Sequence, residues 1–204
     1  MSDSPNYGFD TLQIHAGARP DPATGARQTP IYQTTGYVFR DAEHAAALFN
    51  LQEVGYIYSR LTNPTVAVLQ ERLATLEGGV GGVCCSSGHA AQIMALFPLM
   101  QPGCNVVVST RLYGGTVTQF GQTIKRFGWS AKFVDFDDLD AVRDAIDDNT
   151  RGVFCEALAN PGGDITALRA ISYISDAAVQ PLVVHSTARP PYPCPPIPHV
   201  TPPI

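Results

Sequence analysis

From residue 80 onward, short apolar runs alternate with segments in which apolar residues recur every three or four positions. Continuous apolar runs favour buried strands, and the three-to-four spacing favours amphipathic helices. The predicted strands are Val83–Cys85, Asn105–Ser109, Ala131–Asp135, Gly152–Glu156 and Pro181–His185. The predicted helices are Ala90–Met100, Thr116–Phe127, Leu139–Ile146 and Leu168–Ala178. This alternation predicts an α/β fold, in which helices cover both faces of a mostly parallel sheet.

The residues before this region follow a different pattern. Residues 1–35 have little periodicity and several turn formers, which predicts an extended N-terminal arm. Asp41 is placed to cap a short helix over Ala42–Phe49. Asn63-Pro64 is a strong start signal for a further helix, which ends at Gly78. The apolar stripe of that helix comprises Val66, Leu69, Leu73 and Leu76.

The end of the chain is dominated by proline. Eight of the fifteen residues from Pro190 to Ile204 are proline. That density excludes a helix or a central strand, so only a polyproline-like tail is predicted there. The sequence therefore predicts three parts. They are an arm with a short helix over residues 1–62, an α/β domain over residues 63–187, and a proline-rich tail over residues 188–204.

Composition narrows the classes of protein. The net charge of −5 gives no electrostatic reason to expect nucleic acid or an anionic membrane as a partner. The N-terminus lacks the pattern of a signal peptide, and no apolar run is long enough to cross a membrane. The five cysteines form no C-x-x-C pair, which favours buried free thiols in a reducing cytoplasm. Cys194 with His185 and His199 has poor spacing for zinc, so no metal is expected.

Candidate chemistry begins at Ser86-Ser87-Gly88-His89, where a predicted strand meets a predicted helix. The free backbone N–H groups and the dipole at a helix N-terminus favour a phosphate, and the two serines add hydroxyl donors. The same turn also occurs in α/β proteins for packing alone. His89 by itself fits a packing residue better than a catalytic base. Neither a dinucleotide fingerprint nor a serine-hydrolase elbow is present.

Three segments are expected at the carboxyl edge of the sheet, where ligands collect in such folds: Ser86–His89, Glu156–Gly163 and His185–Thr187. At another strand-to-helix junction, Tyr113 offers a flat ring that either stacks on a planar ligand or stays at the surface. Asn160 belongs either to a simple turn or to a turn whose amide reaches a ligand. Spacing alone leaves both alternatives open.

Several blocks of the sequence together resemble the pyridoxal-phosphate enzymes of cysteine and methionine metabolism. They occur in family order: Gln28–Thr35, Tyr58-Ser59-Arg60, Asn63-Pro64-Thr65, Ser86–Gln92, Leu112–Gly115, Phe120-Gly121-Gln122 and Ala159–Gly163. Within the family, the variants Gly88-His89-Ala90-Ala91-Gln92 and Phe127-Gly128-Trp129 look most like the O-acetylhomoserine sulfhydrylases.

The resemblance implies part of the large domain of a fold-type-I transferase, with pyridoxal 5′-phosphate as its cofactor. Backbone amides of Gly88 and His89 would hold the cofactor phosphate, Tyr113 would stack on the pyridine ring, and Asn160 would bond the phenolic oxygen. The full cofactor-binding set that it implies is Ser87, Gly88, His89, Tyr113, Asn160, His185 and Thr187.

The resemblance also implies partners and a reaction. Tyr58 and Arg60 would reach the cofactor phosphate of a neighbouring subunit, and the arm over residues 1–62 would pack on that subunit. A homo-oligomer, dimeric or tetrameric, is therefore expected. The implied cytoplasmic reaction replaces the acetoxy group of O-acetyl-L-homoserine with sulfide or methanethiol, which gives homocysteine or methionine.

Two departures from the family pattern affect this expectation. His185 stands where the family has an aspartate that keeps the pyridinium nitrogen protonated. A neutral histidine accepts the same hydrogen bond without supplying the negative charge, so a weaker electron sink is expected. The family's Schiff-base lysine, in a Ser-x-Thr-Lys block, is absent from these 204 residues. Lys125 and Lys132 follow no family motif and are expected at the surface.

Without that lysine, the chain is expected to be an incomplete copy that is inactive by itself. The alternative is a non-catalytic remnant that at most binds a phosphate or a subunit of an intact relative.

Overall fold

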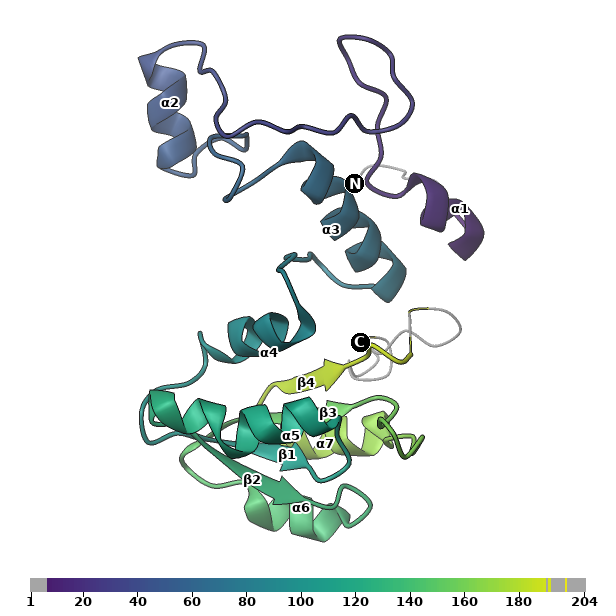
Figure 1. Ribbon diagram of the computed structural model, residues 1–204, viewed down its shortest axis with the longest axis vertical. Helices are drawn as coiled ribbons and strands as arrows, with labels where there is room; N and C mark the ends of the chain where they lie inside the picture. The colour runs from purple at the N-terminus through teal and green to yellow at the C-terminus, as the bar shows by residue number, and fades with distance from the viewer. Residues whose placement is uncertain (1–6, 190, 192–196, 198–204) are drawn as a thin grey trace. The chain divides into compact units, whose positions relative to one another are not determined.

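The computed structural model describes residues 7–189, 191 and 197. Contacts divide the chain into two compact units, Met1–Cys84 and Cys85–Ile204 (Figure 1). The predicted proline-rich tail, with Cys194 and His199, lies almost wholly outside the described residues. The three-part division expected from the sequence stays a prediction.

The described part of the N-terminal unit contains three helices: α1 Phe9–His15, α2 Ala42–Phe49 and α3 Pro64–Glu77. The last two confirm the predicted helices and their caps. Asp41 accepts a hydrogen bond from the His44 N–H (2.7 Å) at the start of α2. Asn63 accepts one from the Thr65 N–H (2.9 Å) at the start of α3, and Gly78 ends α3 in the left-handed conformation.

Helix α1 lies within the segment predicted to be extended, so that prediction is wrong over these seven residues. Its N-cap, Gly8, provides no side-chain hydrogen bond, which leaves the local start signal weak. The helix packs instead against α3. Next to it, Arg72 Nε donates to the Ala16 carbonyl at 3.0 Å, and a Cβ at Gly17 would lie 2.8 Å from the Val68 carbonyl oxygen. Tertiary contact therefore stabilises α1 where local sequence does not.

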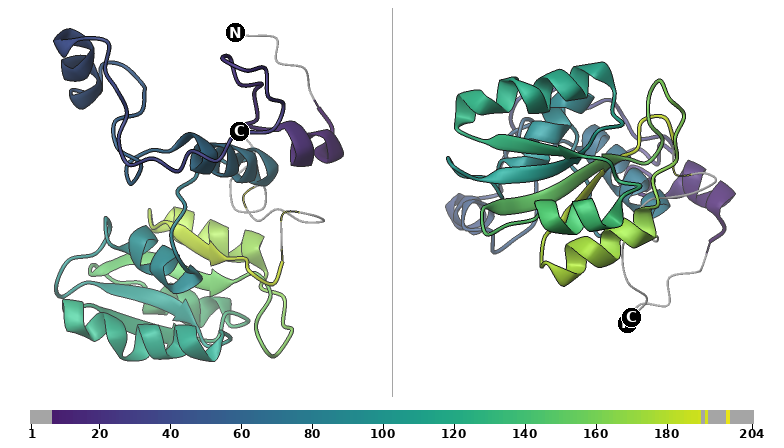
Figure 2. Two further views of the ribbon diagram at one scale, coloured as in Figure 1. Left: turned by 45° about the horizontal axis from the view of Figure 1, so that its top comes forward. Right: turned by 90° about the horizontal axis from the view of Figure 1, so that it is seen from below.

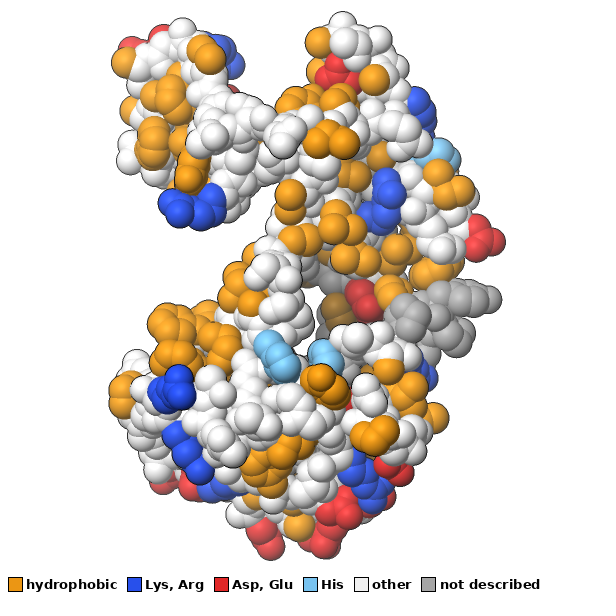
Figure 3. Space-filling view, viewed as in Figure 1, with side chains coloured by type: hydrophobic (Ala, Val, Ile, Leu, Met, Phe, Trp, Pro, Cys, Tyr) orange, Lys and Arg blue, Asp and Glu red, His pale blue; other side chains and the backbone are white. Residues whose placement is uncertain are grey.

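The predicted apolar stripe of α3 is present but stays accessible in this chain. Val66, Leu69 and Leu73 keep 40%, 50% and 45% of their surface exposed, and the helix has no buried residue. Figure 3 shows many apolar side chains, in orange, at the surface of this unit.

The C-terminal unit is built on a four-stranded parallel sheet in the order β2-β1-β3-β4 (Figures 1 and 2). The strands are β1 Asn105–Ser109, β2 Ser130–Val134, β3 Thr150–Glu156 and β4 Leu182–His185, so four of the five predicted strands are confirmed within two residues. The prediction of a strand at Val83–Cys85 is wrong. Although its residues are β-formers, that segment pairs with no strand in the described part of the chain.

Helices cover both faces of the sheet, as predicted (Figure 2). On one face, α4 Gly88–Leu96 and α5 Gly114–Gly121 enclose a core around Val106, Val108, Phe120 and Phe154. On the other face, α6 Leu139–Ala145 and α7 Leu168–Ala177 enclose a core around Val107, Val142, Val153 and Ile171. Successive strand residues thus face opposite cores, as the two-residue period of a strand requires.

The helix predicted over Thr116–Phe127 is divided in two. Helix α5 ends at Gly121, and a 3₁₀ helix, η1, follows over Thr123–Phe127. Between them, Gln122 has φ −132° and ψ −51°, outside the helical region. A glycine at the end of α5 lowers the cost of this interruption, because glycine is a poor helix former.

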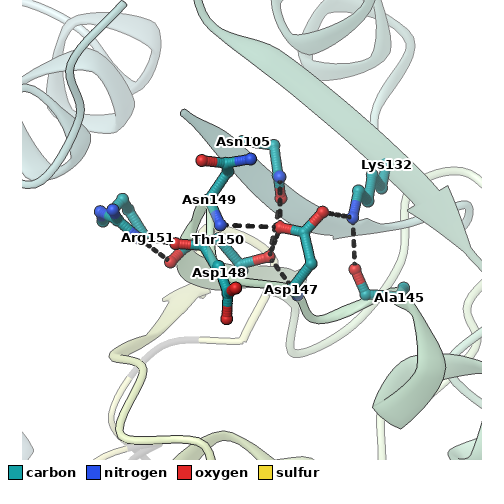
Figure 4. Close-up of polar contacts among 8 residues, drawn as sticks. All are labelled: Asn105, Lys132, Ala145, Asp147, Asp148, Asn149, Thr150 and Arg151. Carbon is teal, nitrogen blue, oxygen red and sulfur yellow. Dashed lines mark hydrogen bonds and ion pairs between the residues drawn. The ribbon is translucent and has the colours of Figure 1, made fainter. Parts of the chain in front are cut away.

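The amino ends of the strands meet at one carboxylate, Asp147 (Figure 4). Its Oδ2 lies 2.6 Å from Lys132 Nζ of β2, and its Oδ1 accepts from Asn105 Nδ2 of β1 (2.8 Å). Thr150 Oγ1 of β3 lies 3.1 Å from the same Oδ1. The Lys132 and Asn105 hydrogen bonds lower the pKa of Asp147 well below its usual range. The Lys132 side chain is half-exposed and forms an ion pair with Asp147, whereas the sequence predicted a surface residue without a partner.

Candidate functional site

A cavity of about 370 Å³ opens at the carboxyl edge of the sheet, beside the ends of β3 and β4. It lies where the strand order reverses around β1 and β3, the place at which doubly wound sheets bind ligands. Its volume is that of a small-molecule site. The lining includes every residue of the predicted cofactor-binding set: Ser87, Gly88, His89, Tyr113, Asn160, His185 and Thr187.

The N-terminus of α4 forms one wall of this cavity. Ser87 is the N-cap, and its hydroxyl accepts from the Ala90 N–H at 3.2 Å. The backbone N–H groups of Gly88 and His89 have no acceptor among the described residues. Two free donors and the positive end of the helix dipole make this wall suited to an anion.

Tyr113 and His89 form an aromatic wall beside those donors. Their rings stack with 6.1 Å between centroids and 27° between planes. Both rings lie close to the backbone of Gly115, where an added Cβ would come within 2.6 Å of Tyr113 Cε1 and 2.8 Å of His89 Cε1. Glycine at position 115 therefore keeps room for the two rings.

The carboxylate of Glu156, at the end of β3, contacts three other residues that line the cavity. It accepts from the Tyr113 N–H (3.0 Å) through Oε1 and from the Asn160 N–H (3.2 Å) through Oε2. His185 Nδ1 lies 3.2 Å from Oε1. The residue is 2% exposed. Sequence reasoning placed Glu156 at this edge but gave it no role, because the family motifs drew attention to its neighbours.

His185 occupies the end of β4, directly opposite Glu156 in the strand register. Its Nε2 lies 2.7 Å from Thr187 Oγ1. The sequence led us to expect that a histidine at this position supplies no negative charge, and that expectation stays a prediction. The structure adds that the Glu156 carboxylate contacts the imidazole.

Two buried glutamines border the same region without full pairing. Gln92, which lines the cavity, donates from Nε2 to Thr116 Oγ1 at 3.3 Å, while its Oε1 has no partner among the described residues. Gln119 donates to the His89 carbonyl at 3.0 Å, and its Oε1 is likewise unpaired. Sequence analysis did not single out either side chain. A buried, unpaired acceptor is costly, so the Gln92 oxygen is available to a hydrogen-bond donor in the cavity.

Tyr58 and Arg60, the predicted contacts to a neighbouring subunit, belong to the N-terminal unit. The Arg60 guanidinium lies 5.0 Å from the centre of the Tyr58 ring, as in a cation–π pair. Arg60 is exposed, so its charge stays accessible. Their predicted role stays a prediction.

The cysteines partly follow the expectation of buried thiols. Cys104 and Cys155 are buried, Cys84 is half-buried, and Cys85 is exposed, so the prediction is wrong for Cys85. Burial, together with the neighbouring Glu156 charge, raises the pKa of Cys155 to about 12. That thiol therefore stays protonated and unreactive at neutral pH.

Neither a membrane span nor a metal centre is found within residues 7–189. No helix there is long and apolar enough to cross a bilayer. No cluster of three or more His, Cys, Asp or Glu side chains in that range is arranged to hold a metal ion.

Comparison with known proteins identifies the family. The sequence profile of the Cys/Met metabolism PLP-dependent enzymes matches residues 10–201. Homocysteine synthase of Schizosaccharomyces pombe is 46% identical over 179 residues, which are 88% of this chain and 42% of that protein. O-acetyl-L-homoserine sulfhydrylase 1 of Thermus thermophilus is 47% identical over 180 residues, which are 88% of this chain and 43% of that protein.

A solved structure agrees with the sequence relatives. A crystal structure from Campylobacter jejuni, named as an O-acetylhomoserine (thiol)-lyase, superimposes with a TM-score of 0.92 at 41% identity. The match covers 96% of this chain and 48% of that one, which carries N′-pyridoxyl-lysine-5′-monophosphate. The chain thus spans less than half the length of these relatives.

The residues of the cavity fit pyridoxal 5′-phosphate. The unpaired N–H groups at the start of α4 suit its phosphate, and the backbone at Gly115 leaves the space in which the Tyr113 ring lies. His185 brings a ring nitrogen, and Gln92 brings an unpaired oxygen, to the same cavity. Every one of these groups belongs to the C-terminal unit.

Proposed function

This chain belongs to the family of Cys/Met metabolism PLP-dependent enzymes, and from that membership we propose that it forms the cofactor-binding part of an O-acetylhomoserine sulfhydrylase. The reaction replaces the acetoxy group of O-acetyl-L-homoserine with sulfide or methanethiol. The observation that carries the proposal is the cavity in which the free N–H groups of α4 face the predicted cofactor residues. The names and identities of the relatives support the choice of substrate.

The chain's residues divide the work of binding. The N–H groups of Gly88 and His89, with the Ser87 cap, hold the phosphate. The Tyr113 ring covers one face of the pyridine, and the Asn160 amide bonds the phenolic oxygen. When bound, the cofactor withdraws electrons from the amino acid substrate, which allows a group to leave from its side chain.

The proposal extends to an assembly in the cytoplasm. Arg60 is exposed and Tyr58 is half-buried in the N-terminal unit, and an arginine fork suits a phosphate. We assign them to the cofactor phosphate of a neighbouring subunit in a homo-oligomer. The exposed apolar stripe of α3 supports the presence of such a subunit, because large apolar surfaces usually mark interfaces.

Titration of the 204-residue protein with pyridoxal 5′-phosphate tests the binding part of this proposal. We expect saturable binding, measured by cofactor fluorescence, and an affinity reduced by about tenfold or more in Gly115→Ala, whose added Cβ displaces Tyr113 and His89. Tyr173→Phe, an exposed position on α7, is the matched control and should bind as the unchanged protein does. Absence of saturable binding, or equal affinity in Gly115→Ala, would contradict the proposal.

The transferase part needs the coding DNA beyond codon 204. A Ser-x-Thr-Lys block downstream, in any frame, is expected. The product of that longer reading frame should release homocysteine from O-acetyl-L-homoserine and sulfide. If no such block exists, the transferase assignment fails and the phosphate- or subunit-binding alternative is left.

A further inference from the structure

Among the residues that line the cavity, Glu156 is the one carboxylate. It is 2% exposed and directly contacts His185, which also faces the cavity. The other titratable groups of the lining are His89 and Tyr113. Within the described lining of the cavity, the carboxylate that His185 meets is therefore the one on β3.

The hydrogen bonds of this pair indicate where the His185 proton lies. Both carboxylate oxygens of Glu156 accept backbone N–H donors, from Tyr113 and Asn160. With both oxygens acting as acceptors, the 3.2 Å contact to His185 is best made by a proton on Nδ1. Nε2 is then the atom that remains for a partner in the cavity.

Thr187 shows that Nε2 is ready for such a partner. Its hydroxyl lies 2.7 Å from Nε2 and serves either as donor or as acceptor. Thr187 is exposed, so its hydroxyl rotates away at little cost. Nε2 also lies 3.8 Å from the position of a Cβ at Gly88, which places it beside the anion-binding turn of α4.

We propose that Glu156 and His185 act as one unit that binds the ring nitrogen of the cofactor, with Glu156 supplying the negative charge that His185 lacks. This inference rests on the proposed function, since it requires a pyridine ring in the cavity. One proton is shared between the ring nitrogen and His185 Nε2. The Glu156 carboxylate compensates the positive charge of this shared proton through its hydrogen bond with His185 Nδ1–H. Glu156 is thus a positioning residue that acts through His185.

The test follows the ring nitrogen directly. The probe is 4′-deoxypyridoxine 5′-phosphate labelled with ¹⁵N in the ring, which has no aldehyde and needs no lysine. Its ¹⁵N chemical shift is recorded against pH on the unchanged protein, on Glu156→Gln and on His185→Asp. We expect the midpoint for loss of the shared proton to fall by about one pH unit or more in Glu156→Gln. His185→Asp places a carboxylate at the ring nitrogen itself and should retain the proton.

A second measurement needs no ligand. Long-range ¹H–¹⁵N spectra of the ligand-free protein should show His185 protonated at Nδ1. In Glu156→Gln the neutral ring should shift toward the Nε2–H form. Tyr173→Phe should leave both readouts unchanged, and circular dichroism checks that each variant is folded. If Glu156→Gln does not fold, the proposal is still tested by the probe titration on His185→Asp and by the His185 spectrum of the unchanged protein.

The outcomes separate the two proposals. If the unchanged protein does not bind the probe, the proposed function fails and this inference fails with it. If the probe binds but its midpoint is the same in Glu156→Gln, the inference alone is overturned. A His185 ring protonated only at Nε2 in the unchanged protein also overturns it.

Discussion

The two ends of the sheet are each organised by a single carboxylate, yet the two sites differ in what they leave unpaired. At the amino end, Asp147 joins Asn105, Lys132 and Thr150 in a closed set of hydrogen bonds (Figure 4). At the carboxyl end, Glu156 holds three cavity residues, while neighbouring donors and acceptors stay unpaired. Closed pairing contributes to stability, whereas unpaired polar groups beside a cavity are available to a ligand.

Burial separates the two carboxylates further. The Asp147 side chain is 45% exposed and is balanced by the Lys132 ammonium. Glu156 is buried, and in the described part of the chain its carboxylate oxygens contact backbone N–H groups and the His185 ring. A buried charge depends strongly on each of its few partners, so the carboxyl end should be the more sensitive of the two.

The largest effect is expected from Glu156→Ala. This change leaves the N–H groups of Tyr113 and Asn160 without an acceptor and frees the ring of His185. Each hydrogen bond lost to a buried charged group costs about 1.5–3 kcal/mol, so the free energy of unfolding should fall by about 2–5 kcal/mol. Urea denaturation measures this change. If Glu156→Ala lost less free energy of unfolding than Thr150→Val at the amino end, the carboxyl end would not be the more sensitive of the two.

A smaller loss is expected from Thr150→Val at the amino end. Valine has the shape of threonine, but it removes the hydroxyl that donates to Asn105 Oδ1 (2.8 Å) and accepts from the Asp147 N–H (2.9 Å). Because Thr150 is fully buried, the free energy of unfolding should fall by about 1–3 kcal/mol.

Thr118→Val is the matched control for that variant. Its hydroxyl donates only to the Gly114 carbonyl within α5, and the side chain is exposed. A change below about 0.5 kcal/mol is expected there. Cofactor binding should be unaffected in Thr150→Val, since the amino end is remote from the cavity. Weakened binding in this variant would show that the two ends are coupled.

The smallest effect concerns the pH dependence of stability. The pKa of Asp147 is below its usual value of 3.8 in the folded chain, chiefly because of Lys132. The contribution of Asp147 to the free energy of unfolding is therefore fully present at pH values above the usual pKa. It is lost as the pH falls through the pKa of the folded chain. Between about pH 5 and about pH 2.5, the melting temperature of Asp147→Asn should fall less steeply with decreasing pH than that of the unchanged protein.

Asp140→Asn is the control for this acid effect, because its side chain is 89% exposed and pairs with Arg143 on the same helix. It should follow the unchanged protein across the same pH range. Equal slopes in Asp147→Asn and the unchanged protein would mean that the Lys132 pair adds nothing to stability.

Much of the fold was predictable because its signals are local. Apolar runs gave four strands within two residues, and the caps at Asp41 and Asn63 gave the starts of α2 and α3. Two predictions were wrong for one reason: a strand was expected at Val83–Cys85, and the helix at Phe9–His15 was not expected. Strand pairing and helix docking depend on distant partners, which local propensity does not encode.

The same division holds for the site. The sequence by itself indicated the phosphate-suited turn at Gly88, the aromatic ring at Tyr113 and the amide at Asn160. The family resemblance added the expectation that His185 stands in place of an aspartate. Only the tertiary structure decided which side chain lies beside His185. Glu156 and His185 are 29 positions apart, yet they are register partners on adjacent strands whose spacing is about 4.8 Å. The pairing of β3 with β4 therefore places a carboxylate beside His185, which the sequence of β4 alone does not show.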